Sequence, residues 1–164
     1  EITRNVDARN VHAFIIGEHG DTEFPVWSHA NVAGLQISEW ISNNPDTDEE
    51  ALVELFFSVR DAAYNIIQKK GATFYGIGAS LARITRAIFN NEQAVLPLSV
   101  YLDGEYDAQD IYIGTPAIID SEGIQHIVEI PLNDSEKAKM KHSVDTIRTH
   151  LNEVLENNPD LKFD

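Results

Sequence analysis

The sequence contains no cysteine and few basic residues. Without cysteine, the chain can form no disulfide, no zinc–thiolate site and no thiol nucleophile. Only 12 Lys and Arg stand against 27 Asp and Glu, so the formal net charge is −15. Nucleic acids and anionic membranes attract basic proteins, and this balance therefore argues against both as partners. We interpret the excess of acidic side chains mainly as an aid to solubility.

Long hydrophobic runs are missing as well. No apolar stretch approaches the roughly 18 residues that span a bilayer. The first residues, EITR, contain neither an initiating Met nor the apolar core of a signal peptide. We therefore expect a cytoplasmic protein. The missing Met further suggests a chain that begins partway through a longer protein, although a processed or trimmed start would look the same.

The length and composition are those of one folded domain. Hydrophobic residues make up 43% of the 164 residues, which is enough for a core. A chain of this length buries about 70% of its unfolded surface. The sequence shows no internal repeat and no low-complexity tract, so we expect residues 1–164 to form a single domain.

The first half of the chain predicts two strands followed by two helices. Residues 11–16, VHAFII, indicate a buried strand that stops at Gly17, and residues 22–33 indicate an irregular second strand. Thr47 and Glu50 form a capping-box pattern, after which helical apolar spacing continues to Gly71. A second helix is expected at residues 73–89.

The second half changes to the period of strands. Residues 94–102, 111–119 and 124–130 predict three strands, with turn sequences between them that favour an antiparallel meander. Asn133 and Glu136 predict the capped start of a last helix. The apolar face of that helix consists of Met140, Val144, Ile147, Leu151, Val154 and Leu155. This mixed order predicts an α+β fold, with antiparallel strands packed against long helices.

The loop after the first strand is the best candidate for chemistry. It contains His19 between Gly17 and Gly20, at the end of a predicted strand. Histidine is the side chain that most readily gives and takes protons near neutral pH, and loops on rigid scaffolds often present reactive groups. From the residues alone, an ordinary surface histidine is the more frequent alternative.

Two blocks of sequence resemble the L-lactate dehydrogenases of the lactate/malate dehydrogenase family. Residues 11–23, VHAFIIGEHGDTE, continuing with PVWS at 25–28, resemble the family's active-site signature. The related malate enzymes share the His-Gly-Asp core but usually depart from this pattern on both sides of it. Residues 70–83, KGATFYGIGASLAR, are similar to the family's substrate-pocket helix. The resemblance covers essentially the whole chain and implies the C-terminal substrate-binding domain, of the bacterial allosteric type.

The resemblance implies roles for five residues of the pocket. His19 would be the acid–base residue in the interconversion of pyruvate and L-lactate, while the cofactor NAD supplies the hydride chemistry. Thr73 would contact substrate and Ile77 would pack on the nicotinamide ring, which agrees with positions four apart sharing a helix face. Ala62 and Ala63 would line the pocket near the substrate's methyl group. By composition alone, the four residues other than His19 would be ordinary helix-packing residues.

Two more residues carry regulatory expectations from the same resemblance. His12 matches a histidine that helps to bind fructose 1,6-bisphosphate across a subunit interface, and positive charge nearby would be needed for the phosphate. The family's arginine partner lies upstream and is not in this sequence, so a strand-edge histidine is the alternative. Tyr64 matches a tyrosine that is phosphorylated in some relatives. The family implies a homotetramer.

Other patterns predict neither a nucleotide-phosphate site nor a metal site in this chain. Residues 76–81, GIGASL, lack the third glycine of a dinucleotide fingerprint and follow a predicted helix, not a strand. The histidine pairs His12 with His19 and His142 with His150 lack partners at the spacing of a ligand set, so we expect no metal.

Several parts of the family's machinery precede the histidine in relatives and are not in this sequence. They are the βαβ nucleotide-binding half, the arginine that binds the substrate carboxylate, the aspartate that pairs with the catalytic histidine, and the mobile-loop arginine. NAD would be bound mainly by that half, and we expect the chain alone to be inactive. Two alternatives stay open: a domain of a malate or other 2-hydroxyacid dehydrogenase, and a non-catalytic module for oligomerisation or fructose bisphosphate binding.

Overall fold

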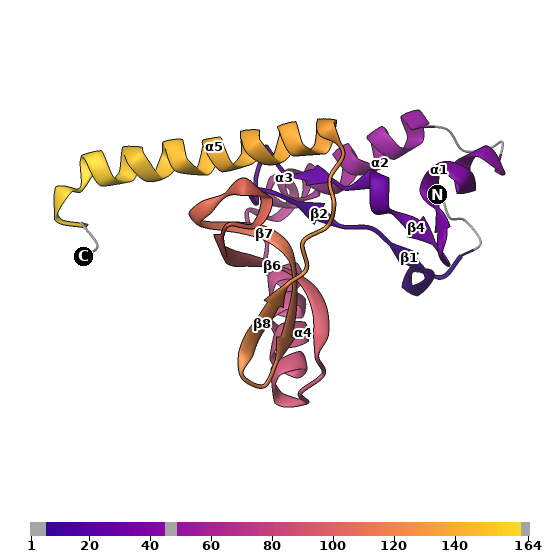
Figure 1. Cartoon of the computed structure of the whole chain (residues 1–164), viewed down its shortest axis with the longest axis horizontal. Helices are drawn as coiled ribbons and strands as arrows, with labels where there is room; N and C mark the ends of the chain where they lie inside the picture. The colour runs from indigo at the N-terminus through magenta and orange to yellow at the C-terminus, as the bar shows by residue number, and fades with distance from the viewer. Residues whose placement is uncertain (1–5, 45–48, 162–164) are drawn as a thin grey trace.

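The computed structural model describes residues 6–44 and 49–161. Its α-helices are α1 (Ile37–Ser42), α2 (Glu49–Arg60), α3 (Ala62–Lys70), α4 (Tyr75–Phe89) and α5 (Asp134–Asn157). Its strands are β1 (Val11–His12), β2 (Ile15–Ile16), β3 (Phe24–Pro25), β4 (Asn31–Val32), β5 (Leu35–Gln36), β6 (Ala94–Asp103), β7 (Gln109–Asp120) and β8 (Gly123–Ile127). Four short 3₁₀ helices complete the order: η1 (Ala8–Asn10), η2 (Trp27–His29), η3 (Glu105–Asp107) and η4 (Pro159–Leu161). The long helix α5 lies across one end of the β6–β7–β8 sheet (Figure 1).

The three-stranded antiparallel sheet β6–β7–β8 confirms the predicted α+β fold and its meander. In β6 the side chains alternate between exposed and at least partly buried, as expected of a strand with one face toward a core. Val100 of β6 pairs with Ile113 of β7, and both are buried. The sheet therefore supplies one wall of the main core.

The main core lies between this sheet, the β2–β3 hairpin and the first half of α5. Its buried residues are Ile16, Phe24, Val26, Val100, Leu102, Ala108, Ile111, Ile113, Ala117, Ile130, Met140 and Val144. A second, smaller cluster joins the β1–β4–β5 sheet to α1 and α2 through Ala30, Val32, Ile37 and Leu52. The loop that contains His19 connects two residues of the main core, Ile16 and Phe24.

The prediction of one continuous strand at 11–16 is wrong. β1 pairs with β4, with His12 opposite Asn31, whereas β2 pairs with β3, with Ile16 opposite Phe24. The chain passes from one sheet to another between them, and Ala13 at this point is exposed. The irregular strand expected at 22–33 is likewise two strands, β3 and β4, separated by η2.

The helix expected from residue 47 to Gly71 is two helices. Thr47 lies outside the described residues. Asp61 separates α2 from α3, and its carboxylate accepts a hydrogen bond from the Arg60 guanidinium at 2.8 Å. Aspartate is a weak helix former. Because the apolar residues keep helical spacing on both sides of Asp61, the sequence pattern did not predict the break. Gly71 ends α3 in the left-handed conformation, with φ 81°.

The capped start of α5 is confirmed. The Asn133 carboxamide accepts from the Glu136 N–H at 2.9 Å, and the Glu136 carboxylate accepts from the Asn133 N–H at 3.1 Å. The predicted apolar face is covered mainly in its first half, while Leu155 in the second half is half-buried. Leu151 and Val154 are 44% and 49% exposed, because α5 extends beyond the sheet there (Figure 1).

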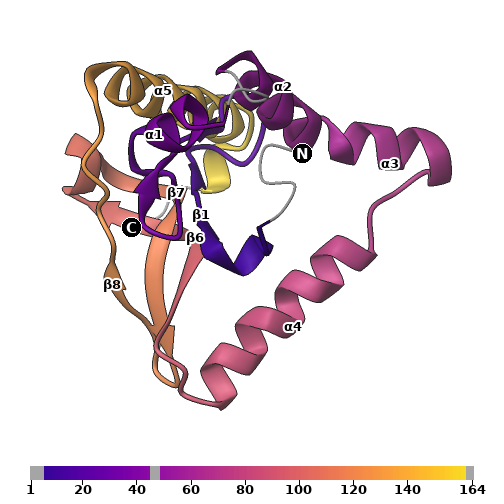
Figure 2. The same ribbon diagram turned by 90° about the vertical axis from the view of Figure 1, so that its right-hand side faces the viewer.

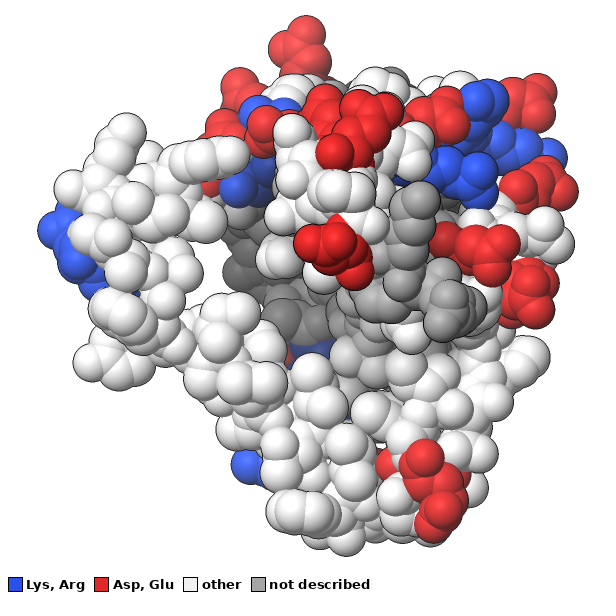
Figure 3. All heavy atoms as spheres, turned by 90° about the vertical axis from the view of Figure 1, so that its left-hand side faces the viewer, with Lys and Arg blue, Asp and Glu red and all other residues white. Residues whose placement is uncertain are grey.

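Helices α3 and α4 form an arm that stands away from the rest of the molecule (Figure 2). Its large exposed apolar side chains are Tyr64, Ile66, Ile67, Phe74, Tyr75, Ile77, Leu81 and Phe89. Residues 62–89 include Lys69, Lys70, Arg83 and Arg86 but no Asp or Glu. Acidic side chains gather on the body of the molecule instead (Figure 3). Among the described residues, no helix combines the length and apolarity needed to cross a membrane.

Candidate active site

His19 lies in the loop between β2 and β3, where the backbone leaves the main core. Its side chain is 98% exposed, and its Nδ1 lies 3.7 Å from a carboxylate oxygen of Glu23, which is 15% exposed. A ring in this position is open to a bound molecule and has one carboxylate neighbour. That arrangement suits proton transfer at an exposed site.

The first fixed point of the loop is a close contact between two glycines. The Gly17 N–H donates to the Gly114 carbonyl, and the Gly114 N–H donates to the Gly17 carbonyl, both at 2.9 Å. A Cβ at Gly114 would lie 2.8 Å from the Gly17 carbonyl oxygen, and Gly17 itself has φ +106°. Only glycine meets both demands without displacement. The loop therefore begins at a fixed distance from β7.

The second fixed point is a group of hydrogen bonds inside and beneath the loop. The Glu18 carboxylate accepts from the Thr22 N–H at 3.1 Å and from the Thr22 hydroxyl at 2.6 Å. The Ser143 hydroxyl of α5 accepts from the Glu18 N–H. These contacts close the loop across its base and leave His19 at its outer end.

Helix α5 also holds the segment that follows the loop. The Glu136 carboxylate accepts from the Ser28 N–H at 3.1 Å and from the Ser28 hydroxyl at 2.6 Å. Burial by itself raises the pKa of Glu136, which is 4% exposed, but the hydrogen bonds from Ser28 and Asn133 outweigh it and leave that pKa below its ordinary value. The charged form of this carboxyl therefore joins α5 to η2.

The arm meets the loop through a hydrogen bond. The Tyr64 hydroxyl of α3 donates to the Asp21 carboxylate at 3.3 Å. Ala62 and Ala63, at the start of α3, are half-buried and exposed respectively. Both alanines thus lie on the element that reaches the His19 loop.

The expected helical face shared by Thr73 and Ile77 is wrong. Thr73 lies in the connection after Gly71, and α4 begins only at Tyr75, after Phe74. Thr73 is exposed, and Ile77 in the first turn of α4 is 58% exposed. Ile77 offers an apolar surface of the kind a flat nicotinamide ring packs against. The role expected of each residue remains a prediction.

His12 lies in β1 and is exposed. The nearest basic residue along the chain within the described part is Arg9, which forms an ion pair with Asp7 at 2.8 Å. This pair is exposed at the surface. A site for phosphate at His12 would have to compete with the Asp7 carboxylate for Arg9.

Sequence reasoning did not find Ser143, Gly114 or the contact of Glu136 with Ser28. Ser143 is fully buried, although serine is seldom fully buried in folded proteins. Its position three residues after Met140 and one before Val144 is a signal, because a polar residue inside an apolar helix face needs a hydrogen-bond partner. Gly114 gave no signal, since its requirement arises only when β7 meets the loop.

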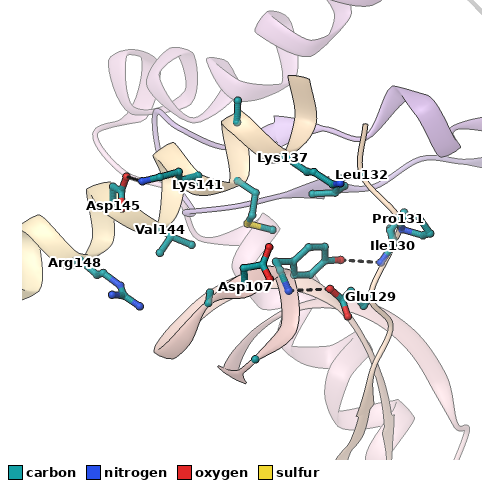
Figure 4. A pocket seen from close by; sticks show the side chains of 15 residues that line it. Asp107, Glu129, Ile130, Pro131, Leu132, Lys137, Lys141, Val144, Asp145 and Arg148 are labelled. Atoms are coloured by element: carbon teal, nitrogen blue, oxygen red, sulfur yellow. Dashed lines mark hydrogen bonds and ion pairs between the residues drawn. The ribbon is translucent and has the colours of Figure 1, made fainter. Parts of the chain in front are cut away.

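A separate hollow of about 780 Å³ lies between α5, the β6–β7 connection and the segment after β8 (Figure 4). Lys141 and Asp145 form an ion pair at 2.6 Å along one wall. On the opposite side, the Glu129 carboxylate accepts from the Tyr106 N–H at 2.8 Å. None of the predicted site residues lines this hollow. Among the described residues, no three His, Asp or Glu side chains come together as a metal site.

Comparison with known proteins identifies the family. The family described as lactate/malate dehydrogenase, alpha/beta C-terminal domain, matches residues 2–158. An L-lactate dehydrogenase 1 of Enterococcus faecalis is 69% identical over 144 residues, which are 88% of this chain and 44% of that protein. The L-lactate dehydrogenase of Lacticaseibacillus casei is 59% identical over 94% of this chain and 47% of that protein. The chain thus spans about half the length of the curated relatives it matches.

Solved structures agree with the fold. A lactate dehydrogenase from a Medee basin deep-sea metagenome library has a TM-score of 0.88 at 46% identity, over 92% of this chain and 49% of that one. A malate dehydrogenase from Salinibacter ruber has a TM-score of 0.86 at 28% identity, over 98% of this chain and 52% of that one. The predicted resemblance is confirmed, and the chain belongs to the lactate/malate dehydrogenase family, whose alpha/beta C-terminal domain it forms.

Proposed function

We propose that this chain is the substrate-binding half of an NAD-dependent L-lactate dehydrogenase, acting in the cytoplasm. The observation that carries the proposal is His19, exposed on a loop whose base is fixed to both β7 and α5. The higher identity to L-lactate dehydrogenases than to malate dehydrogenases supports pyruvate and lactate as the substrate pair.

In this proposal the imidazole of His19 moves the proton. When pyruvate is reduced, protonated His19 donates a proton from a ring nitrogen to the keto oxygen of pyruvate. When lactate is oxidised, the neutral ring accepts the proton of the lactate hydroxyl. NAD, when bound, supplies the hydride chemistry at the substrate carbon. Ile77 would pack on its nicotinamide ring, a role that suits an exposed isoleucine in the first turn of α4.

The arm would supply further contacts to substrate, beside those of the arginines that the family carries outside this sequence. The small side chains of Ala62 and Ala63 leave space for the methyl group of pyruvate, and Thr73 offers a hydroxyl in the connection before α4. The absence of acidic residues from 62–89 also favours an anionic substrate, because a carboxylate meets no like charge from this segment.

The test of this function is substrate discrimination by the complete polypeptide that contains the chain. With NADH, we expect kcat/KM for pyruvate to exceed that for oxaloacetate and for branched 2-keto acids. A preference for oxaloacetate would instead assign the chain to a malate dehydrogenase. Equal, low rates with all three would reject the dehydrogenase proposal.

A second candidate function is assembly and effector binding, which the exposed apolar side chains of the arm favour. Helices with such faces ordinarily pack against other protein surfaces. We propose that the complete protein is a homotetramer and that His12 contributes to a fructose 1,6-bisphosphate site. Fructose bisphosphate should then lower KM for pyruvate in the complete protein, and His12→Gln should abolish this response. An unchanged response in His12→Gln would remove His12 from the effector site.

Tyr64 is proposed as a site of phosphorylation that acts on the His19 loop. Its ring is 56% exposed and its hydroxyl contacts Asp21. A phosphate there would add a charge of about −1.5 to −2 directly beside that carboxylate and push the two elements apart. Phosphorylated protein should therefore turn over pyruvate more slowly than unmodified protein. Equal rates in a kinetic comparison of the two forms would contradict this.

A further inference from the structure

The hydroxyl of Ser143 differs from those of the two threonines further along the same helix. Thr146 and Thr149 each donate to the carbonyl four residues earlier in α5, at 2.9 and 2.8 Å. Ser143 instead contacts the His19 loop, 121 to 125 residues away in the sequence. It is fully buried, with 0% of its surface exposed. A buried hydroxyl that bonds outside its own helix fixes two segments relative to each other.

This one hydroxyl holds the loop at two places. It accepts from the Glu18 N–H, immediately before His19. It also lies 3.1 Å from the Thr22 hydroxyl and 3.3 Å from the Thr22 carbonyl, three residues after His19. The Glu18 carboxylate joins the same two positions from the loop side. Both ends of the segment that holds His19 therefore converge on Ser143.

The fit around the hydroxyl is too close for the loop to shift inward. A Cβ on Gly17 would lie 2.7 Å from the Ser143 Oγ. The Gly17–Gly114 hydrogen bonds hold the same end of the loop from the side of β7. Removing the Ser143 hydroxyl would leave the Glu18 N–H without its acceptor and leave a gap beneath the loop. The distance between the loop and α5 would then no longer be fixed, while the hydrogen bonds between the loop and β7 would remain.

We propose that Ser143 is a positioning residue that sets the place of His19 for proton transfer. The inference rests on the proposed function, because only that function makes His19 the acid–base residue. Ser143 acts through the backbone of Glu18 and Thr22 and does not touch substrate. A displacement of about 1 Å in a reacting group can lower a rate about a hundredfold. Loss of this contact should therefore affect turnover far more than binding.

The experiment compares Ser143→Ala, Ser143→Thr and Thr149→Ala in the complete polypeptide. Thr149→Ala is the matched control, because it removes a hydroxyl from the same helix that bonds only within the helix. We expect Ser143→Ala to lower kcat for pyruvate about tenfold to a hundredfold with an unchanged KM for NADH. Ser143→Thr, which keeps a hydroxyl, should recover part of the loss, and Thr149→Ala should behave as the parent protein.

A second readout does not depend on activity. Hydrogen–deuterium exchange should become at least tenfold faster for the amides of the segment 17–22 in Ser143→Ala, and stay unchanged in Thr149→Ala. If Ser143→Ala fails to fold, Thr22→Val removes the Thr22 hydroxyl from both Ser143 and the Glu18 carboxylate while the Glu18 N–H keeps its acceptor. It should give the same pattern with a smaller change. Faster exchange with normal kcat would overturn the positioning role. Unchanged exchange would overturn the contact itself. If the parent protein has no dehydrogenase activity but Ser143→Ala still exchanges faster, the proposed function is rejected and the contact between Ser143 and the loop stands.

Discussion

At the scale of single residues, the contact between Gly17 and Gly114 shows how the fold restricts position 114 to glycine. Gly114 sits in a strand, where glycine is ordinarily unfavourable because it has no side chain to pack. Here the missing Cβ allows two backbones to approach within hydrogen-bond distance. The space that glycine leaves is filled by the carbonyl of Gly17.

Gly114→Ala should therefore destabilise the protein. The new methyl group would lie 2.8 Å from the Gly17 carbonyl oxygen and force β2 away from β7. We expect a loss of about 1–3 kcal/mol in the free energy of unfolding, measured by urea denaturation. Gly78→Ala is the matched control, because a Cβ there meets nothing within 4 Å and lies on an exposed helix. It should stabilise the protein by about 0.5–1 kcal/mol. Equal effects of the two changes would contradict this description of the loop base.

At the scale of elements, α5 connects the parts of the site. It begins with the Asn133–Glu136 capping box, binds η2 through Glu136 and binds the loop through Ser143. The sequence alone predicted the helix and its cap, because both depend on residues close in the chain. It could not predict the contacts with Ser28 or Glu18, because these depend on how distant segments pack.

Glu136 makes the attachment of α5 sensitive to acid. Its pKa is lower in the folded protein than its ordinary value of 4.5. The carboxylate therefore stabilises the fold at pH values above 4.5, and this contribution is lost as the pH falls through the lowered pKa. Glu136→Gln should cost about 1–3 kcal/mol at pH 7, because one amide oxygen cannot accept from every donor that the carboxylate binds.

Urea denaturation at pH 7 and at pH 3.5 measures this effect. The difference in unfolding free energy between the parent protein and Glu136→Gln should shrink at the lower pH. Glu156→Gln, an exposed change on the same helix, serves as the control and should show a smaller difference at pH 7. A difference for Glu136→Gln that stays constant between the two pH values would show that the charge of Glu136 does not stabilise the fold.

The helices that the sequence predicted less well illustrate the same limit. Apolar spacing predicted one helix up to Gly71 and placed Thr73 on the next one. Asp61 interrupts the first, and the second begins only at Tyr75. Periodicity reports which side chains share a face, but apolar residues can keep helical spacing across a residue at which one helix ends and the next begins. The helical character of these segments was predictable, whereas the break at Asp61 and the start of α4 were not.

At the scale of the whole molecule, the candidate site residues are spread over the body and the arm. His19 belongs to the body, while Ala62, Ala63, Thr73 and Ile77 belong to α3, α4 and their connection. Tyr64 and Asp21 join the two parts. The resemblance to the family supplied these candidate residues, and their roles remain predictions. Their arrangement in space depends on packing that neither composition nor spacing encodes.

The chain alone should not catalyse the reaction. In the proposed mechanism, the residues present here move a proton and contact substrate, while the other half of the enzyme binds most of NAD. We expect NADH absorbance to stay constant when this chain is mixed with NADH and pyruvate. The complete polypeptide at equal concentration provides the positive control. Sustained oxidation of NADH by the chain alone would show that it binds cofactor productively without the other half.

The most direct test of the account is the replacement of His19 in the complete polypeptide. His19→Gln should lower kcat for pyruvate reduction by about 10²–10⁴, because the side chain can no longer donate a proton to the keto oxygen. NADH binding, followed by fluorescence, should be unchanged. His126→Gln, on the exposed surface of β8, is the control and should keep the parent rate. A His19→Gln protein that turns over pyruvate as fast as the parent would contradict the assignment of His19 as the acid–base residue.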